Sequence, residues 1–237
     1  MRFDFQDPAL GSREPPQKTY KNQAEKIQPL DRNPSSGGLL MTKKPQSFDL
    51  PSDADSSDGF DGFKFRIVLL GEAGVGKTSL VRRYTEGTFD AKYKQTLGTT
   101  FANKDVDVGD RKVRLNIWDM GGQSTYRELR RQFMIGASAA LIIYDVTRPE
   151  TFMAMNNWFE SFGEVCPEAP VLICANKIDK REERMVPVEP GLMLRDWFQA
   201  EYHETSARTG EKVADVFRRC AEILIERMLD QDKKTLT

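Results

Sequence analysis

One stretch of the chain combines the residue types and the spacing that bind a phosphate group. Residues 71–79 read GEAGVGKTS and match the pattern G-x-x-x-x-G-K-[ST] of a phosphate-binding loop. Small residues let consecutive backbone N–H groups turn inward around an anion, and the helix that follows would point its positive end at the same spot. Lys77 would reach the outer phosphates, and Thr78 would bind Mg²⁺. The residues expected to contact the ligand are Gly71, Ala73, Gly74, Val75, Gly76, Lys77, Thr78 and Ser79.

The order of apolar segments predicts the scaffold that would hold this loop. An apolar run precedes the loop, and two continuous apolar runs at 139–145 and 170–176 are typical of central parallel strands covered on both faces. Alternating residues at 100–108 and 111–119, joined by a Gly-Asp turn, indicate a hairpin. We therefore expect an α/β domain with a doubly wound sheet, whose ligands bind beyond the carboxyl ends of the strands. Helices are expected at 78–86, 150–164, 189–200 and 211–229.

The first sixty residues differ in composition from the rest of the chain. They are polar, include seven of the twelve prolines and show no sustained period of a helix or a strand. We expect a disordered extension, although isolated apolar residues such as Phe3, Phe5 and Tyr20 would be anchors for a partner in an alternative interpretation. The predicted organisation is an extension at 1–61, a folded domain at 62–230 and a short polar tail at 231–237.

Charge and cysteine content argue against several classes of protein. The 237 residues include 35 basic and 36 acidic side chains, a net charge of −1, so nothing indicates nucleic acid as a partner. The three cysteines lack the spacing of metal ligands. No stretch approaches the roughly 18 apolar residues of a membrane span, and the chain does not open with a secretion signal. We expect a cytoplasmic protein.

Three further polar stretches come at the ends of predicted strands: 119–123 (DMGGQ), 176–179 (NKID) and 205–207 (TSA). A phosphate loop alone leaves ATPases, kinases and GTPases open. The order and placement of these stretches resemble the small GTPases of the Ras superfamily, over residues 64–229, and most of all Rab proteins. The resemblance implies a P-loop NTPase G domain with a mostly parallel six-stranded sheet and helices on both faces.

The carboxylate of Asp179 supplies an independent chemical argument for guanine. It can accept two hydrogen bonds, from N1–H and the exocyclic amine of guanine, whereas adenine offers no such pair of donors. ATP would therefore leave a buried charge unpaired. The resemblance implies further nucleotide contacts from Phe89, Asn176, Lys177, Ser206, Ala207 and Arg208.

The resemblance also implies GTP hydrolysis, a phosphoryl transfer to water that depends on positioning and charge stabilisation. The implied catalytic residues are Lys77, Thr96 and Gln123, with Gln123 orienting the attacking water. The Gly122 N–H would contact the γ-phosphate. No intrinsic arginine finger is apparent, so we expect slow turnover and acceleration by a GTPase-activating protein.

Mg²⁺ binding and switching are expected to share residues. Thr78, Thr96 and Asp119 would hold Mg²⁺, and loss of the γ-phosphate would release two loops at 89–98 and 121–133.

Partner proteins would bind these loops in one nucleotide state and not in the other. Effectors are expected to bind the loops together with an exposed apolar patch of Phe101, Trp118 and Phe133, unless these three are core aromatics. An exchange factor is also expected.

Two departures from the Rab pattern bear on function. Met120-Gly121 adds a glycine that should loosen the second loop and change the hydrolysis rate. The sequence ends without a cysteine, so we expect no prenyl group, no direct lipid anchor and membrane recruitment only through a protein partner. The favoured interpretation is a GTP-hydrolysing switch that recruits effectors in intracellular trafficking. The alternative is a GTP-binding scaffold with negligible hydrolysis.

Overall fold

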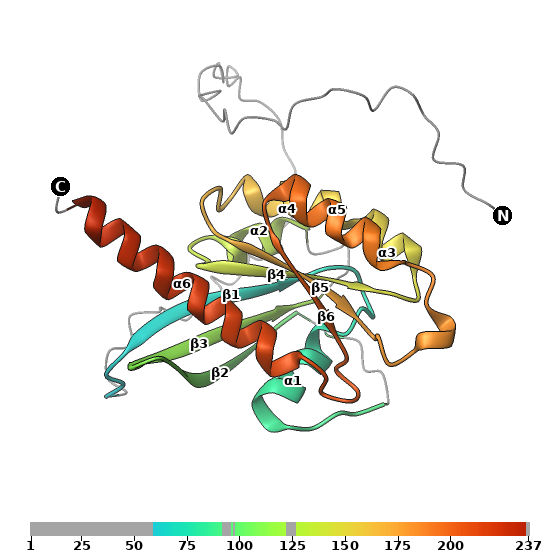
Figure 1. Ribbon diagram of the computed structural model, residues 1–237, viewed down its shortest axis with the longest axis horizontal. Helices are drawn as coiled ribbons and strands as arrows, with labels where there is room; N and C mark the ends of the chain where they lie inside the picture. The colour runs from blue at the N-terminus through green and yellow to red at the C-terminus, as the bar shows by residue number, and fades with distance from the viewer. Residues whose placement is uncertain (1–58, 92–95, 97, 122–126, 236–237) are drawn as a thin grey trace, which may run out of the picture. The chain divides into compact units, whose positions relative to one another are not determined.

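Figure 1 shows a computed structural model of the chain, which describes residues 59–91, 96, 98–121 and 127–235. All but the last three residues of the predicted extension at 1–61 lie outside the described residues.

Six strands form a single sheet in the order β2-β3-β1-β4-β5-β6. Neighbouring strands run parallel except β2, which is antiparallel to β3. The mostly parallel six-stranded sheet is therefore confirmed. The strands are β1 (Phe63–Leu70), β2 (Thr99–Val108), β3 (Arg111–Met120), β4 (Ala139–Asp145), β5 (Val171–Asn176) and β6 (Glu201–Thr205).

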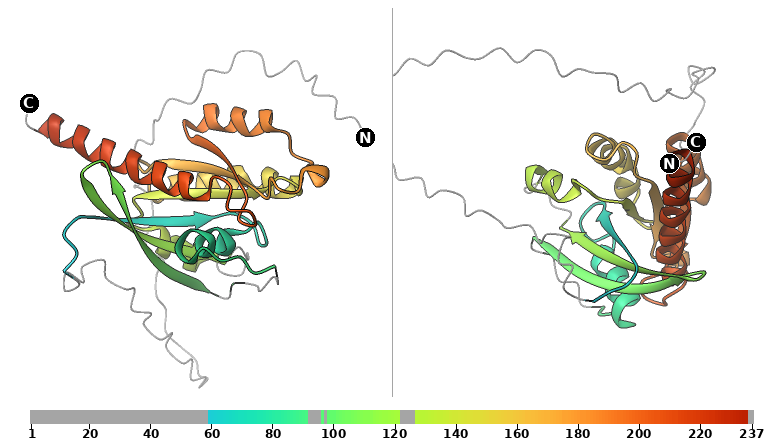
Figure 2. Two further views of the ribbon diagram at one scale, coloured as in Figure 1. Left: turned by 60° about the horizontal axis from the view of Figure 1, so that its bottom comes forward. Right: turned by 90° about the vertical axis from the view of Figure 1, so that its left-hand side faces the viewer.

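Side-chain alternation along the central strands builds a hydrophobic core on each face of the sheet. On β1, Ile67 and Leu69 pack into one core, and Val68 and Leu70 pack into the other. Helices α1 (Lys77–Glu86) and α6 (Val213–Thr235) contribute to the first core. Helices α2 (Arg127–Met134) and α4 (Met155–Gly163) contribute to the second. The two views in Figure 2 show helices on both faces of the sheet. Helices on both faces confirm the doubly wound architecture.

The helices differ from the predictions in three places. The segment expected at 150–164 forms two helices, α3 (Pro149–Met153) and α4, separated at Ala154. The sequence analysis also missed α2, which is only eight residues long and has three apolar residues. Helix α6 continues to Thr235, since no proline or glycine interrupts its polar end, so the tail expected at 231–237 is helical up to that residue. Helix α5 (Val188–Phe198) lies close to its predicted position.

Strand register brings the polar stretches to one edge of the sheet. Asp145 at the end of β4 pairs with Asn176 at the end of β5, which pairs with Thr205 at the end of β6. On the other side of the sheet centre, Leu69 pairs with Asp119. The carboxyl ends of the parallel strands therefore meet where the phosphate loop begins.

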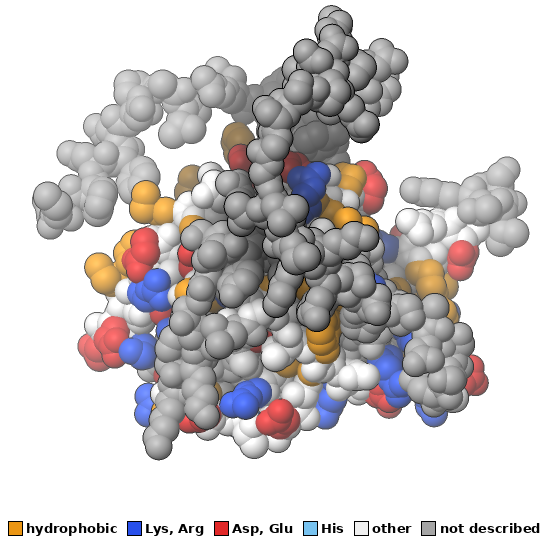
Figure 3. All heavy atoms as spheres, turned by 180° about the vertical axis from the view of Figure 1, so that it is seen from behind, with side chains coloured by type: hydrophobic (Ala, Val, Ile, Leu, Met, Phe, Trp, Pro, Cys, Tyr) orange, Lys and Arg blue, Asp and Glu red, His pale blue; other side chains and the backbone are white. Residues whose placement is uncertain are grey.

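The surface of the described residues carries both signs of charge. Figure 3 shows basic and acidic side chains interspersed on the face that it presents. Within the same residues, no helix is long and apolar enough to cross a bilayer.

Candidate functional site

The loop between β1 and α1 adopts a backbone that only small residues tolerate. Gly71, Gly74 and Gly76 have φ angles of 134°, 78° and 104°. A Cβ at Gly71 would overlap the carbonyl oxygen of Ile143, and one at Gly76 would overlap the side-chain amide of Asn176. The predicted glycines are thus required both for conformation and for close packing against β4 and β5.

Lys77 opens α1 and folds back over the loop. Its Nζ donates hydrogen bonds to the Gly71 oxygen at 2.7 Å and to the Glu72 oxygen at 2.9 Å. The side chain is only 6% exposed. A nearly buried ammonium at the loop attracts an anion strongly, as the sequence pattern predicts. Ser79 follows in the first turn of α1.

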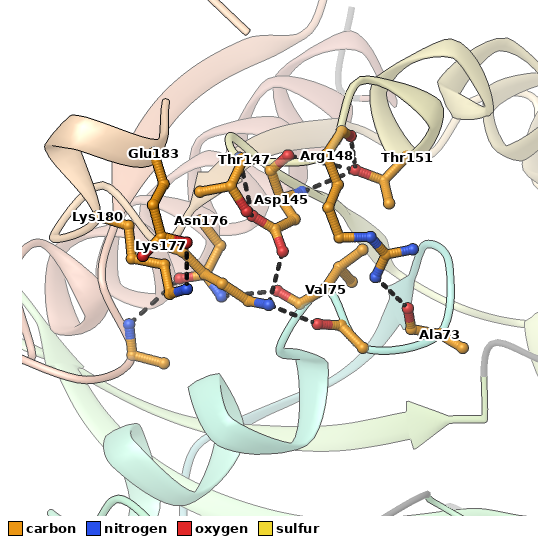
Figure 4. Close-up of polar contacts among 12 residues, drawn as sticks. Ala73, Val75, Asp145, Thr147, Arg148, Thr151, Asn176, Lys177, Lys180 and Glu183 are labelled. Carbon is orange, nitrogen blue, oxygen red and sulfur yellow. Dashed lines mark hydrogen bonds and ion pairs between the residues drawn. The ribbon is translucent and has the colours of Figure 1, made fainter. Parts of the chain in front are cut away.

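Two side chains at the end of β5 hold the outer carbonyls of the same loop (Figure 4). Asn176 Nδ2 donates to the Val75 oxygen at 2.8 Å, and Lys177 Nζ donates to the Gly74 oxygen at 2.8 Å. Lys177 Nζ also lies 2.6 Å from Oδ2 of Asp145, a carboxylate that is 1% exposed. Because carbonyl and N–H groups of one peptide point in opposite directions, these bonds orient the loop amides. The NKID stretch therefore braces the phosphate loop.

Side-chain oxygen atoms that could bind a metal ion lie close together at the end of β3. Thr78 Oγ1 lies 2.7 Å from Thr96 Oγ1 and donates to Asp119 Oδ2 at 2.5 Å. Burial raises the pKa of the Asp119 carboxyl, while the hydrogen bond from Thr78 and the Lys77 ammonium oppose this rise.

The side-chain oxygens of Thr78, Thr96 and Asp119 are suitable ligands for Mg²⁺. Oδ1 of Asp119 is buried and has no hydrogen-bond partner within the described part of the chain. Hydroxyl and carboxylate oxygens are the ligands that Mg²⁺ prefers, usually with water and phosphate completing the shell. No three His, Cys, Asp or Glu side chains among residues 59–91, 96, 98–121 and 127–235 form a metal cluster.

A second carboxylate lies beside the loop that follows β6. Ser206 Oγ donates to Asp179 Oδ1 at 2.6 Å, while Arg208 Nη1 lies 3.8 Å from Asp179 Oδ2. The Asp179 side chain is 11% exposed and that of Arg208 is 69% exposed. A carboxylate has about four acceptor positions, so Asp179 retains capacity for donors from a ligand. Ala207 N donates to Asn176 Oδ1 at 3.2 Å, which joins this loop to β5.

The structure leaves the predicted roles of three residues untested. Phe89 follows α1 and is 37% exposed, so its stacking on a base stays a prediction. Gly122 and Gln123, which were assigned to the γ-phosphate and the attacking water, lie outside the described residues.

The expected aromatic patch needs correction. Trp118 and Phe133 are 3% and 2% exposed, and only Phe101 reaches the surface, at 46%. Phe101 packs edge-on against Trp118, with ring centroids 4.6 Å apart, and the guanidinium of Arg66 lies 4.3 Å from the Trp118 ring centroid. The patch prediction is wrong for Trp118 and Phe133 because both side chains face the core that α2 and α4 cover.

Sequence reasoning missed two residues that support the site. Asp145 was detectable, because it ends a buried strand beside the strand that carries Asn176. Arg83 had no such signal. Its Nε donates to the Ala207 oxygen at 2.9 Å and its Nη2 donates to the Arg208 oxygen at 2.7 Å, so α1 supports the loop after β6.

A family model and individual known proteins were compared with the chain, and both indicate the same family. The sequence model of the Ras family matches residues 66–226. Ras-related protein Rab-3D of Homo sapiens is 35% identical over 179 residues, which cover 75% of this chain and 81% of that protein. Ras-related protein Rab-3B of Bos taurus is 33% identical over 177 residues, 74% of this chain and 81% of that protein. Ras-related protein Rab-3 of Caenorhabditis elegans is 34% identical over 174 residues, 72% and 80% respectively.

Proposed function

The chain belongs to the Ras family, and we propose which of its residues carry out GTP binding and hydrolysis. The protein binds GTP and GDP together with Mg²⁺ and hydrolyses GTP. The observation that carries the assignment is the meeting of the phosphate loop, Asp119, Asn176 and Thr205 at one edge of the sheet. The alternative of a scaffold without hydrolysis is not favoured by the comparisons.

Base recognition is assigned to Asp179. Its carboxylate would accept hydrogen bonds from N1–H and the exocyclic amine of guanine, while Ser206 holds its other oxygen. Asn176 and Ala207 would flank the base edge, with Lys177 along the base plane. Hydrogen bonds that link the stretches at 71–79, 176–179 and 205–207 support this assignment.

Phosphate binding and hydrolysis are assigned to the other half of the site. The loop amides and Lys77 would bind the phosphates, the Gly122 N–H would contact the γ-phosphate, and Gln123 would orient the attacking water. Thr78, Thr96 and Asp119 would hold Mg²⁺, which when bound supplies positive charge to the phosphate oxygens. Because the transfer goes directly to water, the protein's task is positioning and charge stabilisation.

The conformational change between the GTP and GDP states is assigned to the same residues. Thr96 lies beside Thr78, and loss of the γ-phosphate would free the segments at 89–98 and 121–133, the second of which includes most of α2 rather than a loop alone. Ras-family proteins act with effectors, exchange factors and GTPase-activating proteins. We assign Phe101 to the effector surface, because it is the exposed member of its aromatic group. The similarity to Rab-3 proteins supports a role in vesicle trafficking.

Substitution of Asp119 by Asn tests the metal assignment. The two side chains have nearly the same shape, but Asn lacks the charge that would attract Mg²⁺. We expect GDP to leave the variant about tenfold faster than wild type in millimolar Mg²⁺. This factor corresponds to roughly the free energy of one interaction with a charged group. In excess EDTA the two release rates should converge. A difference of the same size with and without Mg²⁺ would contradict the assignment.

Substitution of Gln123 by Leu tests the hydrolytic assignment. Leu cannot hydrogen-bond to water, so single-turnover release of phosphate from GTP should slow by roughly tenfold or more. The dissociation constant for GDP should change less than threefold, because Gln123 is not assigned to GDP. Equal rates of phosphate release for the variant and wild type would defeat hydrolysis through Gln123.

A further inference from the structure

Arg148 lies in the turn between β4 and α3 and reaches the phosphate loop from outside. Its Nη1 donates a hydrogen bond to the Ala73 oxygen at 3.0 Å, as Figure 4 shows, and its Nε lies 2.7 Å from Glu150 Oε1. The guanidinium is close enough that a Cβ added to Gly74 would lie 3.2 Å from Nη1. This contact joins residues 75 positions apart and belongs to none of the motifs that predicted the site.

The turn that carries Arg148 is itself fixed. The Arg148 N–H donates to the Asp145 oxygen at 3.0 Å, and the Arg148 oxygen accepts from Thr151 N at 3.0 Å and from Thr151 Oγ1 at 2.7 Å. Asp145 in turn pairs with Lys177, which holds the next loop carbonyl, that of Gly74. Arg148 therefore extends from a backbone that is already fixed, so holding its side chain against Ala73 costs only side-chain entropy.

The contact acts on one particular peptide of the phosphate loop. The described peptides include no cis bonds, so a carbonyl held from outside turns the N–H of the same peptide inward. The peptide that Arg148 holds is the one between Ala73 and Gly74, and its N–H belongs to Gly74. A cation on the carbonyl also polarises the peptide and strengthens that N–H as a donor.

We propose that Arg148 is a positioning residue of the nucleotide site, which holds the Ala73–Gly74 peptide so that the Gly74 N–H faces the phosphates. The inference rests on the proposed function, because it requires that a nucleotide bind in this loop. Arg148 acts through the peptide and does not itself contact the ligand. Its removal is expected to speed nucleotide release, since one loop amide would no longer be held toward the phosphates.

The test is the release rate of fluorescently labelled GDP from the full-length protein in Mg²⁺. Arg148→Met should release GDP three- to tenfold faster than wild type. Arg148→Lys should stay within twofold, because an ammonium can still donate to the Ala73 oxygen. Arg195→Met is the matched control. Arg195 pairs with Asp196 at exposures of 42% and 68%, against 38% and 65% for Arg148 and Glu150, and belongs to α5 rather than to a site loop.

The outcomes separate this inference from the proposed function. A wild-type protein that retains no guanine nucleotide would overturn the proposed function and the inference with it. A wild-type protein that retains GDP, with Arg148→Met releasing it within twofold of the wild-type rate, would overturn the inference alone. Equal acceleration by Arg148→Met and Arg195→Met would also overturn it, as would equal rates for Arg148→Met and Arg148→Lys. Should Arg148→Met fail to fold, Arg148→Ala is measured under the same criteria.

Discussion

Replacement of Asp179 by Asn is expected to weaken GDP binding by on the order of a hundredfold or more, the worth of two hydrogen bonds to a charged acceptor. Asn replaces one carboxylate oxygen with an N–H₂ group, which would face the donors of guanine. The Ser206 hydroxyl can still donate to the remaining oxygen, so the fold should be retained. Equilibrium titration with labelled GDP measures the loss.

The control for this prediction is Asp196→Asn, the same chemical change at an exposed pair on α5. Its affinity for GDP should stay within twofold of wild type. Competition with GDP, ADP and IDP adds a second readout, because IDP lacks the exocyclic amine. The preference for GDP over IDP should shrink in Asp179→Asn, and an unchanged preference would contradict the assignment of Asp179 to the base.

Replacement of Gly71 by Ala is expected to lower the free energy of unfolding by at least about 3 kcal/mol and to abolish tight GDP binding. A left-handed backbone alone costs roughly 1–2 kcal/mol for a residue with a Cβ. At Gly71 the added Cβ would also overlap the Ile143 oxygen, which belongs to the buried strand β4 and cannot move freely. Denaturant unfolding followed by circular dichroism measures the stability.

The matched control is Gly87→Ala at the end of α1. Gly87 has φ 71°, but a Cβ there would meet nothing within 4 Å. We expect a loss of only about 1–2 kcal/mol and an unchanged affinity for GDP. Equal destabilisation by the two substitutions would show that the close contact with β4 has no consequence of its own.

The parts of the site that were predictable are those defined by local sequence. A glycine-rich turn between a strand and a helix has few alternatives to the loop at Gly71–Thr78, and strand ends in a parallel sheet converge on one edge. Apolar runs of strand length predicted β4 and β5 because both faces of these strands are buried. Motif and topology therefore predicted that these polar strand ends meet, as Asn176 and Thr205 do, whereas the hydrogen bond from Asn176 to Val75 was not predicted.

The rest depends on contacts between distant segments that carry no pattern. Arg83 and Arg148 each donate to backbone oxygens more than 70 residues away, and nothing in their neighbourhoods distinguishes them from other surface arginines. The exposure of Trp118 was mispredicted for a related reason. Its position on β3 fixes the face on which it lies, but whether that face is covered depends on α2 and α4.

Guanine binding is tested most directly by the identity of the nucleotide that the full-length protein retains through purification. The protein is denatured, and the released small molecules are identified by ion-exchange chromatography and quantified against protein. We expect a guanine nucleotide at close to one per chain in wild type, and much less in Asp179→Asn. An adenine nucleotide, or no nucleotide together with no measurable binding of added GDP, would contradict the assignment of this site to guanine.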